Sequence, residues 1–213
     1  MMTIDDPKRI VASGYDDCAG AYMDARAGDP VSELALLTGK LPPAARVLDI
    51  GCGAGVPVTA ALARVATVIG VDISASQIEL ARRNVPSARF IQGDIMEQEF
   101  DERSFDAAVA FYMIFHLPRG EQPDLLARLS RWIRPGGYLL ATLPGSDHHG
   151  YIEPDFFGAT MYWSHYDTPW YIERLSGIGF EILHQDLLGH GYREGSELPS
   201  EKHPIILARL AEG

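Results

Sequence analysis

The chain has 213 residues, of which 46% are hydrophobic and 22% are charged, a size and balance that suit one α/β domain with a sizeable core. Its 18 Lys and Arg residues against 29 Asp and Glu residues give a formal net charge of -11, which argues against nucleic acid as a partner. Two cysteines are too few for a disulfide framework, the first residues do not resemble a signal peptide, and the longest apolar runs are strand-sized. We therefore expect a cytoplasmic protein without a membrane partner.

Two helices are predicted before the first strand. Apolar and aromatic residues recur at steps of three and four over residues 10–23, and a Gly-Asp-Pro sequence then separates them from a second helix at 31–39. Tyr15 and Tyr22 lie seven residues apart and therefore share one face of the first helix, with Arg26 one turn beyond Tyr22.

The sequence VLDIGCGAGVPVT at residues 47–59 predicts a strand that turns sharply into a helix. Glycine at Gly51, Gly53 and Gly55 permits positive φ and close approach of a ligand to the main chain, and the N–H groups at a helix start attract polar or anionic groups. A dinucleotide fingerprint is excluded because Val56 stands where its third small residue belongs, and no Gly-Lys-Ser/Thr follows as in a P-loop. We expect a flat or charged ligand against this turn.

The next two strands each end at a carboxylate. Residues 67–72 are rich in β-branched side chains and end at Asp72, about 20 residues beyond the first glycine. Nucleotide-binding α/β folds place at this point the acid that binds both ribose hydroxyls. Asp72 would alternatively cap the following helix, but Ser74 can do this itself. A third strand at 88–92 leads to Asp94 in a Gly-Asp-Ile sequence.

A fourth strand is predicted at 104–111, followed by the sequence YMIFHLP and a helix from about Glu121. Pro135, Gly136 and Gly137 then predict a helix stop and an abrupt reversal into a fifth strand.

The order and spacing of these pieces, from Arg46 to Leu143, resemble the class I S-adenosylmethionine-dependent methyltransferases, in particular their small-molecule, type 11-like domains. The resemblance implies a Rossmann-like α/β fold, with a seven-stranded, mostly parallel sheet, helices on both faces and an antiparallel last strand. A helix at 168–176, a strand from residue 179 and a last strand at 204–210 suit this ending.

We expect a single domain because the chain has no internal repeats or Gly/Ser linkers. Its predicted parts are a helical cap at 1–40, a cofactor-binding core at 41–143, a substrate lid at 144–177 and a strand pair at 178–213.

The resemblance further implies S-adenosylmethionine as cofactor and S-adenosylhomocysteine as product. Asp94 would face the adenine amino group and Ile95 would cover the ring, while Tyr15, Tyr22 and Arg26 would close over the methionyl carboxylate. Alternatively, the two tyrosines are half-buried packing residues. The implied cofactor-binding residues are Tyr15, Tyr22, Arg26, Asp49, Gly51, Cys52, Gly53, Gly55, Asp72, Ile73, Gln77, Asp94, Ile95 and Phe111.

Residues 144–171 predict an aromatic lid over the acceptor pocket, since the segment holds eight aromatic residues and three histidines. Metal binding is not expected, because two of the histidines are adjacent and no acidic cluster completes a ligand set. The candidate catalytic residues are Tyr112, His116 and His165. A histidine at 116 or 165 can remove the proton of a hydroxyl acceptor, or His116 simply bonds to backbone in its own turn.

The predicted activity is methyl transfer to a small-molecule acceptor by direct in-line displacement. The alternatives are a methyltransferase acting on a protein, and a non-catalytic cofactor-binding module. The sequence leaves open the acceptor, the choice among O-, N- and C-methylation, and the oligomeric state.

Overall fold

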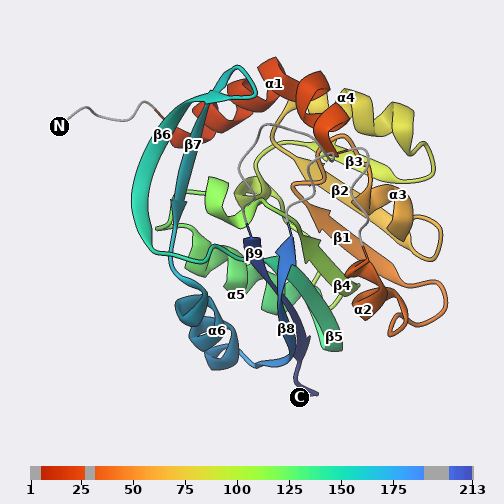
Figure 1. Cartoon of the computed structure of the whole chain (residues 1–213). Helices are drawn as coiled ribbons and strands as arrows, with labels where there is room; N and C mark the ends of the chain where they lie inside the picture. The colour runs from red at the N-terminus through yellow and green to blue at the C-terminus, as the bar shows by residue number, and fades with distance from the viewer. Residues whose placement is uncertain (1–5, 27–31, 190–201, 213) are drawn as a thin grey trace.

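A seven-stranded sheet with strand order β3-β2-β1-β4-β5-β9-β8 forms the centre of the protein (Figure 1). The computed structural model describes residues 6–26, 32–189 and 202–212. Strands β3 to β5 run parallel, and β9 is antiparallel to both of its neighbours, which confirms the predicted fold class. The strands are β1 (Arg46–Ile50), β2 (Thr67–Asp72), β3 (Arg89–Gln92), β4 (Phe105–Ala110), β5 (Ile133–Thr142), β8 (Phe180–Gly189) and β9 (Lys202–Leu210).

Both faces of the sheet are covered by helices, as alternation along the strands requires. Val47 of β1 packs in a cluster with Leu37 and Leu62, from α2 (Leu34–Thr38) and α3 (Val58–Leu62). Its neighbour Leu48 points to the opposite face and packs with residues of α5 (Gln122–Trp132) and α6 (Thr168–Gly177). Helix α4 (Ala75–Asn84) packs with β2, β3 and residues of α3.

A long helix, α1 (Pro7–Arg26), packs against a separate two-stranded sheet, which we call the ribbon and which consists of β6 (His148–Phe156) and β7 (Ala159–His165). Figure 1 shows α1 and the ribbon together at one end of the main sheet. Their packing is close because Gly14 has no side chain: a Cβ there would lie 2.4 Å from the carbonyl oxygen of Thr160. None of the described helices is both long and apolar enough to cross a membrane.

The segment predicted as a lid, 144–177, forms two different kinds of structure. It forms the ribbon as far as His165, whereas α6 belongs to the helical layer on the sheet, with Tyr171 and Leu175 fully buried in the main core. Helix α6 packs there because its apolar face has the sheet to pack against.

The predicted Pro-Gly-Gly reversal is corrected to a bulge inside β5. Helix α5 ends at Trp132 and β5 begins at the next residue, so that the pairing with β4 shifts between Ile133 and Tyr138. Gly136 adopts a φ of +76°, and a Cβ on Gly137 would lie 2.7 Å from the carbonyl oxygen of Asp106. Along the edge of the sheet, β8 extends to Gly189, and the loop predicted between β8 and β9 lies outside the described residues.

Candidate functional site

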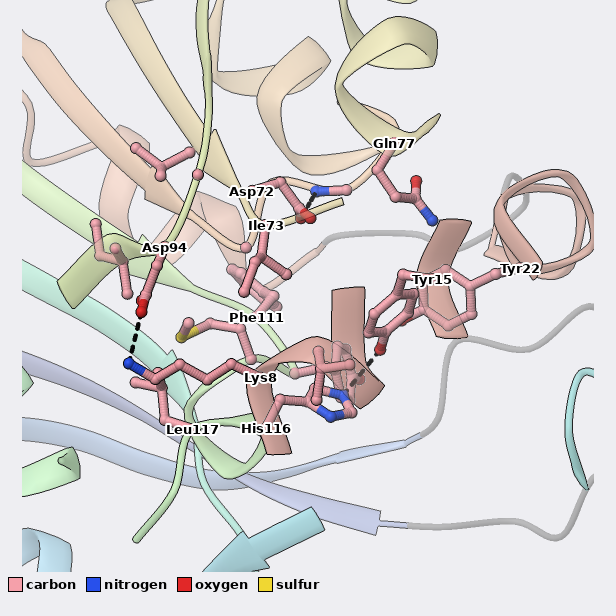
Figure 2. A pocket seen from close by; sticks show the side chains of 18 residues that line it. Lys8, Tyr15, Tyr22, Asp72, Ile73, Gln77, Asp94, Phe111, His116 and Leu117 are labelled. Carbon is pink, nitrogen blue, oxygen red and sulfur yellow. Dashed lines mark hydrogen bonds and ion pairs between the residues drawn. The ribbon is translucent and has the colours of Figure 1, made fainter. Parts of the chain in front are cut away.

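A cavity opens at the carboxyl ends of the parallel strands, between the sheet and α1 (Figure 2). Its empty space, open mouth included, is about 680 Å³. We call it the central cavity. An adjoining hollow beside the glycine turn shares six lining residues with it: Tyr22, Gly51, Gly53, Gln77, Phe111 and Tyr112.

Most of the predicted site residues meet here. Arg26, Asp49 and Cys52 line only the adjoining hollow, whereas Gly55 and His165 line neither space. The predicted site residues that line the central cavity are Tyr15, Tyr22, Gly51, Gly53, Asp72, Ile73, Gln77, Asp94, Ile95, Phe111, Tyr112 and His116.

The three glycines of the turn all adopt positive φ, but for different reasons. A Cβ on Gly51 would lie 2.5 Å from the Cβ of Met113, and one on Gly55 would lie 3.3 Å from the Cα of Ala81 in α4. A Cβ on Gly53 would meet only the Gln77 side chain, at 3.7 Å, and would otherwise project into open space. Gly53 is therefore the glycine that brings bare backbone to a ligand.

Asp72, at the end of β2, is held by two backbone groups. The N–H of Gly53 donates to its Oδ2 at 2.8 Å and the N–H of Ser74 to its Oδ1 at 2.9 Å. Burial raises the pKa of Asp72 to about 6 although both hydrogen bonds oppose the shift. Ser74 itself caps α4 by accepting from the Gln77 N–H at 3.1 Å, as expected, so capping does not require Asp72.

Gln77 has a buried amide with no partner. Its side chain is 1% exposed, and neither Oε1 nor Nε2 has a hydrogen-bond partner among the described residues. Leaving such a group unsatisfied costs about 1–3 kcal/mol, and the amide lines both the central cavity and the adjoining hollow. A polar ligand in this position would satisfy it, so the residues fit a cofactor with hydroxyl or charged groups beside Asp72.

The far end of the central cavity is lined by Ile73, Asp94 and Ile95. Asp94 accepts from the Met96 N–H at 2.9 Å, which caps the short 3₁₀ helix η1 (Ile95–Glu97). A carboxylate that lines the cavity together with two isoleucine side chains suits a flat apolar ring with an amino group on its edge.

Lys8 is a residue that the sequence analysis missed. Its ammonium lies 2.5 Å from the Oδ2 of Asp94 and also pairs with Glu121, so it joins α1 to the adenine end predicted for the cavity. Lys8, Val11 and Tyr15 follow one another at steps of three and four along α1 and all line the cavity. That periodicity is the sequence signal that could have identified Lys8 as a cavity residue. The other cavity-lining residues not predicted are Val71, Gly93, Met113 and Leu117.

The adjoining hollow is lined by a carboxyl group and a guanidinium. Asp49 is 1% exposed and accepts a hydrogen bond of 2.5 Å from the Thr59 hydroxyl, and burial raises its pKa to about 7. The Arg26 guanidinium stacks over Tyr112, with 4.1 Å between its carbon and the ring centroid. A carboxyl group and a guanidinium lining one space suit a ligand that carries both an amino and a carboxylate group.

Tyr112 and His116 follow β4 on the other side of the cavity. Tyr112 adopts a φ of +56°, which is unusual for a bulky residue, and its N–H donates to the Thr142 hydroxyl at 2.6 Å. His116, in the 3₁₀ helix η2 (Ile114–His116), bonds through Nδ1 to the carbonyl of Tyr162 at 3.0 Å and through Nε2 to the hydroxyl of Tyr15 at 2.8 Å. Burial lowers the pKa of His116 to about 4. It thus bonds to backbone of the ribbon and not, as the alternative prediction had it, within its own turn.

His165, predicted as a candidate base, lies against backbone at the base of the ribbon. It is buried at the end of β7, paired across the ribbon with His148, and its Nδ1 lies 2.6 Å from the carbonyl oxygen of Ser146. Neither the central cavity nor the hollow includes it. The pairing of β6 with β7 sets the position of His165, and no local sequence pattern predicts that pairing.

The aromatic lid is only partly what the composition predicted. Phe156 packs edge-on against Tyr15 and Trp163 lies 4.2 Å from the His116 ring, so both back the cavity wall. Trp170 instead stacks on a neighbouring tyrosine at 3.7 Å beside the main core. Among the residues that the structure describes, no group of three or more His, Cys, Asp or Glu side chains is placed to hold a metal ion.

Comparison with known proteins gives related sequences over the core. Residues 47–137 match a family model described as a methyltransferase domain. The chain is 39% identical over 132 residues to a trans-aconitate 2-methyltransferase of Deinococcus radiodurans, covering 60% of this chain and 48% of that protein. It is 36% identical over 101 residues to a fatty-acid O-methyltransferase of Mycolicibacterium smegmatis, covering 46% of this chain and 36% of that protein. The chain thus spans less than half the length of these relatives.

Solved structures agree with the fold over the whole chain. A 1,6-didemethyltoxoflavin-N1-methyltransferase of Burkholderia thailandensis superposes with a TM-score of 0.70 at 22% identity, covering 99% of this chain and 93% of its own. The [4+2]-cyclase SpnF superposes with a TM-score of 0.72 at 18% identity, covering 100% and 99%. At these identities the likeness concerns the fold alone.

Proposed function

We propose that this chain, whose residues 47–137 match a methyltransferase domain, is a class I S-adenosylmethionine-dependent methyltransferase that transfers a methyl group from that cofactor to a small-molecule acceptor by direct in-line displacement. The observation that carries the proposal is the buried, unpartnered amide of Gln77 beside Asp72 and the bare backbone of Gly53. A cavity with these groups at the carboxyl ends of parallel strands is a ligand site of the kind open α/β sheets form.

The described residues support one orientation of the cofactor. Asp72 would accept from the ribose hydroxyls, and Ile73 and Ile95 would enclose the adenine, with Asp94 at its amino group. Asp49 and Arg26, in the adjoining hollow, would bind the amino and carboxylate groups of the methionyl part.

The cofactor supplies a methyl group activated by a sulfonium leaving group, so the protein needs no catalytic triad. The residues of the cavity would hold the acceptor in line and exclude water, and positioning of this kind is worth about 7–11 kcal/mol of the barrier. Tyr112 and His116 lie on the acceptor side of the cavity, and α1 covers it.

The composition of the site supports a small-molecule acceptor. The cavity is walled largely by aromatic and apolar side chains, which suit a small organic molecule. The relatives named above are a trans-aconitate and a fatty-acid methyltransferase, which supports a small-molecule acceptor here. The two cysteines, both buried free thiols, are consistent with the cytoplasmic location that the composition predicts.

The test is isothermal titration of the purified chain with S-adenosylmethionine, followed by incubation with methyl-labelled cofactor and a panel of small molecules. We expect saturable binding and release of S-adenosylhomocysteine with at least one acceptor. Absence of binding heat and of any thermal shift would refute the proposal. If the label enters protein in a cell extract but no small molecule, the proposed small-molecule acceptor is wrong and a protein acceptor takes its place.

A further inference from the structure

A hydrogen-bonded chain leads from the cavity wall into the ribbon. The hydroxyl of Tyr15, on α1, lies 2.8 Å from Nε2 of His116, and Nδ1 of the same ring lies 3.0 Å from the carbonyl oxygen of Tyr162. Figure 2 shows the Tyr15 hydroxyl directed at the imidazole. The three groups come from α1, η2 and β7, so this series of hydrogen bonds forms only when the helix and the ribbon are docked.

The chemistry of the two ends fixes the direction of the hydrogen bonds. A backbone carbonyl can only accept, so Nδ1 must carry the proton that it donates to Tyr162. With the ring neutral, Nε2 is then the basic nitrogen, and it accepts from the Tyr15 hydroxyl. The group that meets a substrate along this path is therefore the phenol oxygen of Tyr15, while the basic nitrogen of His116 lies behind it.

We propose that Tyr15 is the catalytic residue that contacts the nucleophilic oxygen of a hydroxyl-bearing acceptor, and that His116 acts behind it as the proton acceptor. This inference rests on the proposed methyl transfer and adds the acceptor class to it. As the acceptor oxygen bonds to the methyl carbon and the carbon–sulfur bond breaks, the acceptor proton passes to the Tyr15 oxygen and the Tyr15 proton passes to Nε2. The positive charge of the sulfonium ends on the imidazolium, so charge and atoms balance.

The surroundings of His116 suit a weak base that serves an oxygen acceptor. Among the described residues, the rings packed against the imidazole are Tyr15 from α1, Phe115 from η2 and Trp163 from β7, and His203 of β9 stacks on Phe115. Burial lowers the pKa of His116 to about 4. A base of this strength can take the proton of a hydroxyl as its oxygen is methylated, because a methylated hydroxyl is strongly acidic, whereas an amine attacks through its free lone pair and needs no base in the transfer step.

The first experiment reads the proton positions without any acceptor. In ¹⁵N NMR spectra of the wild-type protein, His116 should show a protonated Nδ1 and a bare, hydrogen-bonded Nε2. Tyr15→Phe should shift the Nε2 signal and leave Nδ1 protonated. Tyr138→Phe, which removes a phenol from β5 outside the cavity lining, should change neither. A proton on Nε2 in the wild type would overturn the proposal.

The second experiment measures methyl transfer with matched acceptors: phenol against benzylamine, and cyclohexanol against cyclohexylamine. We expect a fall in kcat of about 10²–10⁴-fold with the hydroxyl compounds in both Tyr15→Phe and His116→Gln, with no further loss in the double variant, and no comparable fall in any transfer to the amines. The acceptor KM should change little, since the effect lies in the chemical step. An undiminished kcat with the hydroxyl compounds in Tyr15→Phe, or an equal fall with the amines, would refute the assignment.

Titration with S-adenosylmethionine separates this inference from the proposed function. If Tyr15→Phe and the wild type bind the cofactor with the same heat while kcat is unaffected, only the role of Tyr15 fails. If the wild type itself does not bind, the methyl-transfer proposal fails as a whole.

Discussion

Replacing Asp72 by Asn should weaken cofactor binding and at the same time make the protein more stable. Burial raises the pKa of this carboxyl from 3.8 to about 6, so the folded protein holds a proton that the unfolded chain has lost between these pH values. Stability therefore falls as the pH rises through this window, and above it the ionised carboxylate costs up to about 3 kcal/mol. A neutral amide avoids that cost.

The net gain is smaller because the amide cannot replace both acceptors. Asp72 accepts from the N–H groups of Gly53 and Ser74, and an Asn side chain can satisfy only one of them, which returns about 1–2 kcal/mol. The expected result at pH 8 is stabilisation by about 1–2 kcal/mol, or a Tm higher by about 2–8 °C. Cofactor affinity should fall by about 10²-fold, since hydrogen bonds from the ribose hydroxyls to a carboxylate are worth about 1.5–3 kcal/mol each.

Thermal unfolding at pH 8 and pH 5 and titration with S-adenosylmethionine measure both effects. The stabilisation should shrink at pH 5, where the wild-type carboxyl is largely protonated. Asp101→Asn, at an exposed position, serves as control and should change neither quantity. A variant that is less stable than the wild type at pH 8 and binds the cofactor equally well would refute the reasoning on both counts.

Three further predictions concern the turn, the histidine and the cap. Gly51→Ala should lower stability by more than about 1 kcal/mol, because its Cβ would lie 2.5 Å from a neighbouring side chain, whereas Gly53→Ala should chiefly weaken cofactor binding. Comparable losses of stability in the two variants, measured by denaturant unfolding, would contradict this. Burial of His116 should cost the wild type about 3 kcal/mol as the pH falls from 6.5 to 4, opposite in sign to the gain from Asp72 in the same window, so the stability of His116→Gln relative to the wild type should rise by about 3 kcal/mol over this range in denaturant unfolding. Gly14→Ala should undock α1 and speed its amide hydrogen exchange, while Gly20→Ala, with open space around it, should leave exchange unchanged or slower; equal exchange in the two would count against the packing argument.

The parts that sequence reasoning predicted are those whose signals are local. The turn at residues 51–55 and the carboxylate ending β2 carry their geometry in a few adjacent residues, and β2 begins and ends where expected. The sheet order follows from the same pieces, because parallel strands joined by helices have few permitted arrangements.

The parts that could not be predicted depend on contacts between distant segments. Histidine is a residue type common in catalysis, but the pairing of β6 with β7 places the His165 ring against the carbonyl oxygen of Ser146. Lys8 reads as an ordinary surface residue until α1 docks beside Asp94. The low pKa of His116 likewise arises from burial under Trp163, which the sequence does not reveal.

The contact between Tyr15 and His116 spans 101 residues of chain, and the Tyr162 carbonyl that orients the histidine comes later still. Tyr15 therefore gains its hydrogen-bond partner only when segments far apart in the sequence have come together. Closing such long loops is slow, so the docking of α1 onto η2 and the ribbon should be a late step of folding. The cavity that this helix covers should then become complete only at that step.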